Sequence, residues 1–137
     1  MSAVTATEGA KVRHDLLHKG SSVDRGTDMQ WGLFTNSSAI GTLKGLALAA
    51  ITEPTGGGYA RTTLTDASWN NTVADHSTYA TQTFTASGTV TGTIYGWFIA
   101  TTGTTPRLMY IGKFDALPSG INMILNDALS YTPDVLA

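Results

Sequence analysis

Residues Val90 to Asp115, with the sequence VTGTIYGWFIATTGTTPRLMYIGKFD, decide the fold of this chain. Two apolar runs flank a break rich in threonine, glycine and proline, and this pattern predicts a β-hairpin with a medium-length loop. Successive side chains of a strand point to opposite faces, so both faces of the first run are apolar. We expect Ile94 and Phe98 on one face, and Tyr95, Trp97 and Ile99 on the other.

The return run of this hairpin is also apolar at mid-strand on both faces. Along it, Leu108, Tyr110 and Phe114 alternate with Met109, Ile111 and Lys113. Such strands occur at the centre of a sheet, where both faces are buried. Alternatively, one face packs on the chain's own core and the other packs against a partner chain. The sequence leaves both arrangements open.

The composition indicates one ordinary domain with few charges. A chain of 137 residues is long enough to bury a core without disulfides, and it contains no cysteine. Charged residues make up 13% of the chain, against roughly 25% in a typical soluble domain. The net charge of −2 provides no basic field for nucleic acid. We therefore expect part of the surface to be covered by another chain.

The sequence predicts neither membrane insertion nor secretion. The longest apolar run, around Gly45 to Ile51, is too short to cross a bilayer. The N-terminus lacks the charged and apolar regions of a signal peptide. We expect a protein that is synthesised in the cytoplasm and has neither a membrane nor a nucleic acid as its partner.

The N-terminal segment predicts a short arm and then a helix. Met1 to Val4 form the arm, and residues 5–20 form the helical region. Thr5 and Glu8 have the spacing of a capping box, which places an amphipathic helix over Thr7 to Lys19. Its apolar stripe consists of Val12, Leu16 and Leu17, and Gly20 supplies the stop.

Residues 28–137 predict a series of short strands. Glu53 to Gly58 is a break, because proline lacks a backbone donor and glycine allows unusual turns. Asp66 to Ser77 is expected to be a long polar loop, and Leu43 to Ile51 is either a helix or a strand. Besides the hairpin, strands are predicted over Met29 to Thr35, Tyr59 to Thr65, Thr78 to Ala86, Ile121 to Leu125 and Leu129 to Thr132, where Pro133 ends the last one.

These elements predict a mainly β fold. We expect an antiparallel β-sandwich, of jelly-roll or immunoglobulin-like type, with about seven short strands and one N-terminal α-helix. The chain is predicted to be a single domain over residues 1–137, in which the arm covers 1–4, the helix 5–20 and the sandwich 28–137.

No motif predicts catalysis, a metal or a cofactor. His14 and His18 share a helical face, but no carboxylate stands in ligand register beside them. Asp75 and His76 lack the glycine-flanked serine motif that would support a hydrolase triad. Residues 56–58 resemble a phosphate loop only superficially, because a strand follows them. We expect a protein that is not an enzyme.

Three stretches together resemble a family of small bacteriophage virion proteins, often labelled tail-fibre or structural proteins, some of which decorate capsids. The first is the Trp31 to Thr35 stretch WGLFT, and the second is Thr52 to Arg61, similar to the family's T-E-x-x-G-G-G-Y-A-R signature. The third joins GWFI at 96–99 and LMYIG at 108–112 with Ser119-Gly120 and Ala128-Leu129. Their order and spacing cover most of the chain.

The chain departs from the family pattern at three places. Ile40 to Ile51 is longer and more apolar than the short turn that the family commonly has, which suggests an added contact. Ala100 stands where the family has aspartate, and Gly120-Ile121 replaces its Gly-Asp.

The resemblance implies a structural β-sandwich of a phage virion. The function that we expect is that of a non-catalytic capsid decoration, or cement, protein on the virion surface. Its expected partners are the major capsid protein and further copies of itself, as a homotrimer. The predicted contact residues are Met1, Ser2, Ala3, Val4, Trp31, Arg61, Tyr95 and Trp97. A core position is an equally good interpretation for the two tryptophans. The alternative function is a tail-fibre or tail-tip module that recognises host glycan through Trp69 and Tyr79.

Overall fold

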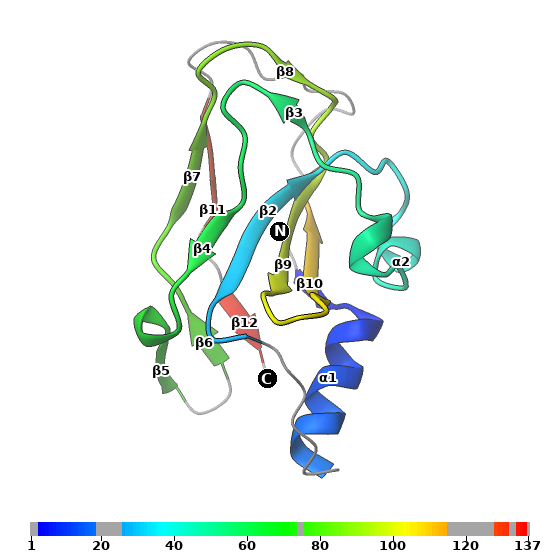
Figure 1. The fold of residues 1–137 in the computed structure, drawn as a ribbon, viewed down its shortest axis with the longest axis vertical. Helices are drawn as coiled ribbons and strands as arrows, with labels where there is room; N and C mark the ends of the chain where they lie inside the picture. The colour runs from blue at the N-terminus through cyan, green and yellow to red at the C-terminus, as the bar shows by residue number, and fades with distance from the viewer. Residues whose placement is uncertain (1–2, 19–25, 74–75, 115–127, 132–133, 137) are drawn as a thin grey trace.

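The protein folds around a five-stranded antiparallel sheet with the strand order β1-β10-β9-β2-β4. The computed structural model describes residues 3–18, 26–73, 76–114, 128–131 and 134–136. The hairpin supplies the central strand of the sheet and one of its two neighbours, as Figure 1 shows. The strands of this sheet are Ala3–Thr5 (β1), Met29–Phe34 (β2), Thr62–Leu64 (β4), Gly96–Thr101 (β9) and Leu108–Lys113 (β10).

The predicted hairpin is confirmed over residues 96–113, whereas Val90 and Thr91 pair with Gly56 and Thr55 instead. The hairpin also contains an irregularity that the sequence did not predict. Leu108 pairs with Ala100 and Tyr110 pairs with Ile99, so the register shifts by one residue at Met109. Such a bulge places neighbours on faces that simple alternation does not predict. Tyr110 packs against one core cluster, whereas Leu108 belongs to the other.

Alternation also fails just before the first hairpin strand. Ile94 belongs to the same cluster as Trp97, and Tyr95 packs against the cluster that contains Phe98. Both placements are the reverse of the sequence expectation. The reason is that β9 begins only at Gly96, so the two preceding residues do not follow the strand pleat.

Both faces of the central sheet are buried by the chain itself. One face, the strand-covered face, packs against the smaller sheets, and the opposite, helix-covered face packs against helical segments (Figure 1). The strand-covered cluster comprises Trp31, Leu33, Leu64, Phe84, Ala86, Val90, Ile94, Trp97 and Ile99. The helix-covered cluster comprises Ala6, Phe34, Leu43, Leu48, Ile51, Phe98, Ala100, Leu108 and Ile111.

The smaller sheets complete a mainly β, sandwich-like fold, as predicted. They contain more strand segments than expected, because residues 66–77 are not simply a loop. Asn70–Val73 (β5) and His76–Thr78 (β6) form strands after a short 3₁₀ helix, Asp66–Ser68 (η2). The other strands are Thr55–Gly56 (β3), Gln82–Thr85 (β7), Val90–Thr91 (β8), Ala128–Tyr131 (β11) and Asp134–Leu136 (β12), paired as β11-β7, β12-β6-β5 and β3-β8. The predicted strand over 121–125 lies outside the described residues.

The second face of the sheet is covered by helical segments. Thr7–His18 (α1) agrees with the predicted helix, and Leu43 to Ile51, left open by the sequence, is helical rather than extended. It contains the end of Ile40–Leu43 (α2) and the 3₁₀ helix Leu48–Ala50 (η1). The cover is close to the sheet, since a Cβ on Gly9 would clash with the carbonyl oxygen of Met109.

Candidate interaction surface

The two predicted tryptophan contacts lie in the core. Trp31 is 1% exposed and Trp97 is 0% exposed, and both belong to the strand-covered cluster. The structure therefore favours the core interpretation for these side chains. Neither ring is available to another chain in the described fold.

The predicted N-terminal arm is partly built into the chain's own sheet. Ala3, Val4 and Thr5 pair with Gly112, Ile111 and Tyr110 of β10. The half-buried Val4 side chain packs against the helix-covered cluster. Met1 and Ser2 lie outside the described residues, so their predicted contact stays a prediction.

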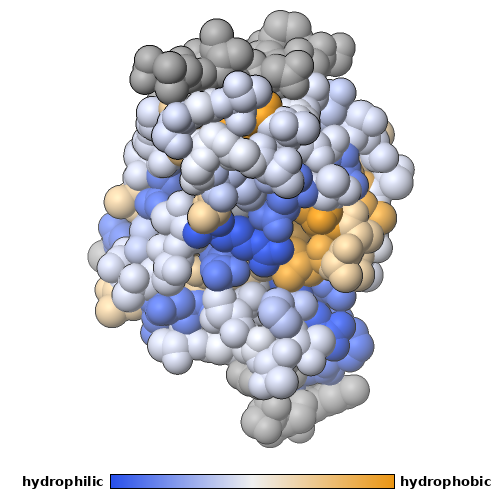
Figure 2. All heavy atoms as spheres, turned by 45° about the horizontal axis from the view of Figure 1, so that its top comes forward, coloured by the Kyte–Doolittle hydropathy of each residue, from blue (hydrophilic) through white to orange (hydrophobic). Residues whose placement is uncertain are grey.

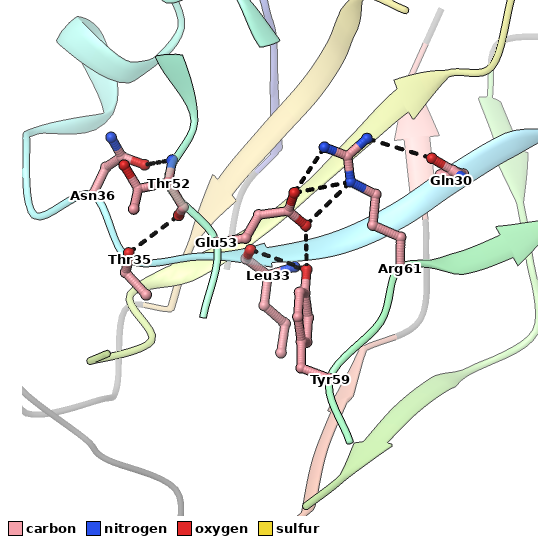
Figure 3. A network of polar contacts seen from close by, with 8 residues as sticks. All are labelled: Gln30, Leu33, Thr35, Asn36, Thr52, Glu53, Tyr59 and Arg61. Carbon is pink, nitrogen blue, oxygen red and sulfur yellow. Dashed lines mark hydrogen bonds and ion pairs between the residues drawn. The ribbon is translucent and has the colours of Figure 1, made fainter. Parts of the chain in front are cut away.

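Arg61 belongs to a polar network centred on Glu53 (Figure 3). Its Nη2 lies 2.7 Å from Glu53 Oε2, and its Nε donates to both carboxylate oxygens. The guanidinium also lies 5.2 Å from the centre of the Phe98 ring. Hydrogen bonding to Glu53 raises the pKa of Arg61. The guanidinium is therefore engaged within the chain, and 27% of the side chain remains exposed.

Tyr59 completes this network and closes the edge of β2. Its hydroxyl donates to Glu53 Oε1 at 2.6 Å and accepts from the backbone N–H of Leu33 at 2.9 Å. β4 pairs with β2 only from Met29 to Trp31, so the tyrosine replaces a strand partner beyond that point. Burial, and then the hydrogen bond to Glu53, raise the pKa of Tyr59. The matching residues of the T-E-x-x-G-G-G-Y-A-R stretch thus stabilise the fold.

The three glycines of that stretch make the turn before Tyr59. Gly56, Gly57 and Gly58 have φ values of 77°, 58° and 74°, which side chains disfavour. The carbonyl of Gly57 accepts a 2.9 Å hydrogen bond from the N–H of Ser87. This geometry explains the glycine run as a turn, in agreement with the sequence interpretation.

A different region offers the outward-facing apolar surface. Residues 39–51, here called the apolar segment, comprise α2, η1 and the connections beside them. Leu43, Leu48 and Ile51 anchor the segment in the helix-covered cluster. Hydrophobic residues gather on one side of the molecule in Figure 2, on the side where Figure 1 shows α2.

The exposed face of the apolar segment carries few polar groups. Ile40 and Leu46 are half-buried and pack against the helix-covered cluster, as does Tyr95, one of the predicted contact residues. The exposed residues of the segment are Ala39, Gly41, Thr42, Lys44, Gly45, Ala47, Ala49 and Ala50. Four of these exposed residues are alanines and only one is charged, so the outer face of the segment presents methyl groups and few charges.

Glu8 fixes the apolar segment to the central sheet. Its Oε2 accepts the backbone N–H of Leu48 at 3.0 Å and that of Leu108 at 2.9 Å. Arg107 Nη1 lies 3.3 Å from the other carboxylate oxygen, Glu8 Oε1. The predicted capping box is therefore wrong, because Thr5 belongs to β1 and Glu8 bridges a helical layer and a strand.

One lysine lies within the apolar segment and a second lies beside it. Lys44 is exposed at the end of α2, and Lys113 Nζ lies 5.5 Å from the centre of the Tyr95 ring. Lys113 also donates to the carbonyls of Ser37 and Ser38, just before the segment. Within the described residues, neither ammonium group pairs with a carboxylate.

The candidate glycan platform is partly buried. Trp69 and Tyr79 meet edge to face at a ring-centre distance of 5.2 Å, and both pack against the strand-covered cluster. The Tyr79 hydroxyl accepts the backbone N–H of Thr65. The pair contributes to the packing of the strand layer, and the rings are not displayed as a flat, exposed platform.

The candidate histidines and aspartate for a metal site or a triad lie largely outside the described side chains. No three His, Cys, Asp or Glu side chains among the described residues could hold a metal ion. His14 is exposed on α1, whereas the side chains of His18 and His76, and the whole of Asp75, lie outside the description. No helix in the described part of the chain is long and apolar enough to span a membrane.

Comparisons of this chain with family models, with curated proteins and with solved structures gave no match. The phage resemblance therefore rests on the three sequence stretches alone. Sequence reasoning noticed the length and apolarity of 40–51, yet it did not assign the surface to these residues. The sequence signal that could have indicated this surface was the departure of residues 40–51 from the family pattern.

Proposed function

We propose that this chain is a capsid decoration protein, which binds the outer surface of a phage capsid and stabilises the contacts between major capsid subunits. The observation that carries the proposal is the outward-facing apolar surface of residues 39–51 on a chain with only 13% charged residues. The three virion-like sequence stretches support the same function. No chemical step is required of the protein.

The fold suits this role because it presents the contact surface without a large ordering cost. Leu43, Leu48 and Ile51 anchor the apolar segment, and Glu8 holds it to the sheet. Burying apolar surface contributes about 25 cal/mol per Å², from which the costs of association are subtracted. Many copies on one particle would multiply a modest gain at each site. We propose that the chain binds as a homotrimer, so that each unit contacts several capsid subunits.

Copy number in the particle tests this function directly. We expect quantitative gel analysis of purified virions to show hundreds of copies of the chain per particle, in a fixed ratio to the major capsid protein. A few copies per particle would instead support the tail-fibre or tail-tip alternative. Complete absence from the particle would reject both virion roles.

The stabilising effect needs a separate measurement. Shells that lack the protein should rupture at a lower temperature or a lower urea concentration than shells to which the purified protein has been added back. Equal resistance of the two kinds of shell would contradict a cement function, even if the protein were bound.

A further inference from the structure

Building on the proposed function, we propose that the apolar segment meets the capsid, and that its partner surface is an apolar patch bordered by carboxylates. The face combines exposed alanines with Lys44 and, at its border, Lys113. This combination specifies the chemistry of the partner, which the proposed function leaves undefined.

Alanine side chains make the outer face suitable for close approach. Ala47, Ala49 and Ala50 are exposed around η1, while the neighbouring Leu48 is 8% exposed and faces inward. An exposed alanine by itself needs no explanation. Here the alanines follow one another on a segment whose half-buried Ile40 and Leu46 extend the same apolar surface. A matching apolar patch could contact this face with little loss of side-chain entropy.

The face is also held in place near its middle and at its C-terminal end. The carbonyl of Lys44 accepts the backbone N–H of Thr7 at 2.8 Å, which ties α2 to the start of α1. At the C-terminal end, Asn36 Oδ1 accepts the N–H of Thr52 at 2.8 Å, and Asn36 Nδ2 donates to the carbonyl of Ala50 (Figure 3 shows the first contact). A surface fixed in this way binds without paying for its own ordering.

The charges around the face are unbalanced towards positive. Lys44 and Lys113 have no carboxylate partner among the described residues. The two nearby carboxylates are already engaged, Glu8 with Arg107 and two backbone N–H groups, and Glu53 with Arg61. The chain as a whole is nevertheless negative, at −2. A partner with carboxylates around its apolar patch would complement this local charge.

The same charges disfavour a second copy of the chain as the occupant. A two-fold contact places the same patch on both subunits, so the lysines of two copies would share one interface. Like charges brought together in this way oppose association. The face therefore fits a different protein better than it fits the same face of a second copy.

A matched pair of variants tests the surface. Ala49 and Ala67 are both exposed and both stand in the middle of a three-residue 3₁₀ helix, η1 and η2 respectively. Purified wild-type, Ala49→Glu and Ala67→Glu proteins would be titrated onto shells of the major capsid protein that lack this chain. We expect Ala49→Glu to weaken binding by about tenfold or more, and Ala67→Glu to leave it unchanged. Ala47→Glu replaces Ala49→Glu if circular dichroism shows that the latter is unfolded.

Lys44→Glu tests the acidic character of the partner in the same assay. We expect weaker binding of the variant, and wild-type binding that falls with added salt more steeply than binding of the variant. Binding of Lys44→Glu as tight as that of the wild type, with the same salt dependence, would overturn the acidic partner.

The remaining outcomes separate the two proposals. If the wild type and both alanine variants bind equally, the capsid contact lies elsewhere and only the surface assignment fails. If the wild type does not bind the shells at all, the proposed function fails and the surface assignment with it. If Ala49→Glu changes the oligomeric state in sedimentation, or abolishes binding to anionic vesicles, the face serves self-association or a membrane and the inference is overturned.

Discussion

The two faces of the central sheet are buried by different means, and their covers differ on the outside. Over the strand-covered face, Phe84 of β7 points inward while Thr83 and Thr85 are exposed. On the helix-covered face, the segment that buries Leu43 and Leu48 exposes alanines. At these positions β7 presents hydroxyl groups to water, whereas the apolar segment presents methyl groups.

This difference helps to explain why the hairpin is apolar on both faces. The sequence allowed one face of the hairpin to be reserved for a partner chain. In the structure both faces are used internally, with Trp97 on one side and Phe98 on the other, each 0% exposed. The proposed contact surface therefore lies one layer further out, on the helical cover and not on the sheet itself.

The largest expected effect concerns the strand-covered face. Trp97→Ala should lower the free energy of unfolding by about 3–5 kcal/mol, because it removes a fully buried ring and leaves a cavity. Urea unfolding followed by circular dichroism measures this loss. Thr85→Ala, at an exposed position of β7, is the control and should change stability by less than about 0.5 kcal/mol. A stable Trp97→Ala protein would show that this ring is not a core anchor.

The helix-covered face is expected to depend on one carboxylate. Glu8→Ala should cost about 2–3 kcal/mol, since the backbone N–H groups of Leu48 and Leu108 lose their acceptor. Hydrogen exchange should increase first at these two amides, which places the damage in the helical cover. Glu8→Gln keeps one oxygen acceptor and should recover part of the loss. Unchanged protection at both amides would contradict the bridge.

Tyr59 provides a smaller, pH-dependent effect. Tyr59→Phe should cost about 1–2 kcal/mol at neutral pH, because the N–H of Leu33 and the carboxylate of Glu53 lose the hydroxyl. The folded chain raises the pKa of Tyr59 above its ordinary value of 10.0. The unfolded chain therefore releases this proton first, and stability should fall as the pH rises above about 10.

Unfolding free energies measured between about pH 8 and pH 11 check the sign of that effect. Tyr59→Phe should show a shallower alkaline loss than the wild type. Tyr110→Phe is the comparison variant. Burial also raises the pKa of Tyr110, so this variant should likewise lose less stability at alkaline pH than the wild type. If Tyr59→Phe and the wild type lose stability in parallel, the Tyr59 hydroxyl does not titrate as the structure indicates.

The smallest expected effect is on the outer face of the helical cover. Ala49→Glu should leave the free energy of unfolding within about 0.5 kcal/mol of the wild type, because position 49 is exposed. Thermal unfolding of the wild type, Ala49→Glu and Ala67→Glu, compared side by side, measures this difference. A large destabilisation would show that Ala49 belongs to the packed cover and would remove it from the candidate contact surface.

Local pattern predicted much of the fold. Strict alternation placed Trp97 and Phe98 on opposite faces, and apolar spacing located the helix that begins at Thr7. Pattern failed where a distant partner decides the structure. Glu8 matched a local cap but bonds residues about 40 and 100 positions away. The bulge at Met109 likewise depends on the partner strand, so the sequence of β10 alone does not reveal it.

The candidate surface was only partly predictable for a related reason. Large aromatic residues suggested contacts, yet Trp31 and Trp97 are the residues that gain most from burial in the chain's own core. The exposed alanines of 47–50 carry no such signal individually. Their importance depends on Leu48 turning inward, and only the fold reveals that orientation.

The strand order of the central sheet also has a consequence for how the chain acquires its fold. Its first strand, Ala3–Thr5, pairs with Leu108–Lys113, and Met29–Phe34 pairs with Gly96–Thr101. A ribosome releases the early strands long before their partners have been made. The sheet can therefore close only after nearly the whole described chain has emerged, and loops that long are slow to close. We expect refolding in milliseconds to seconds, and an incomplete chain should expose the apolar strand β2 to aggregation.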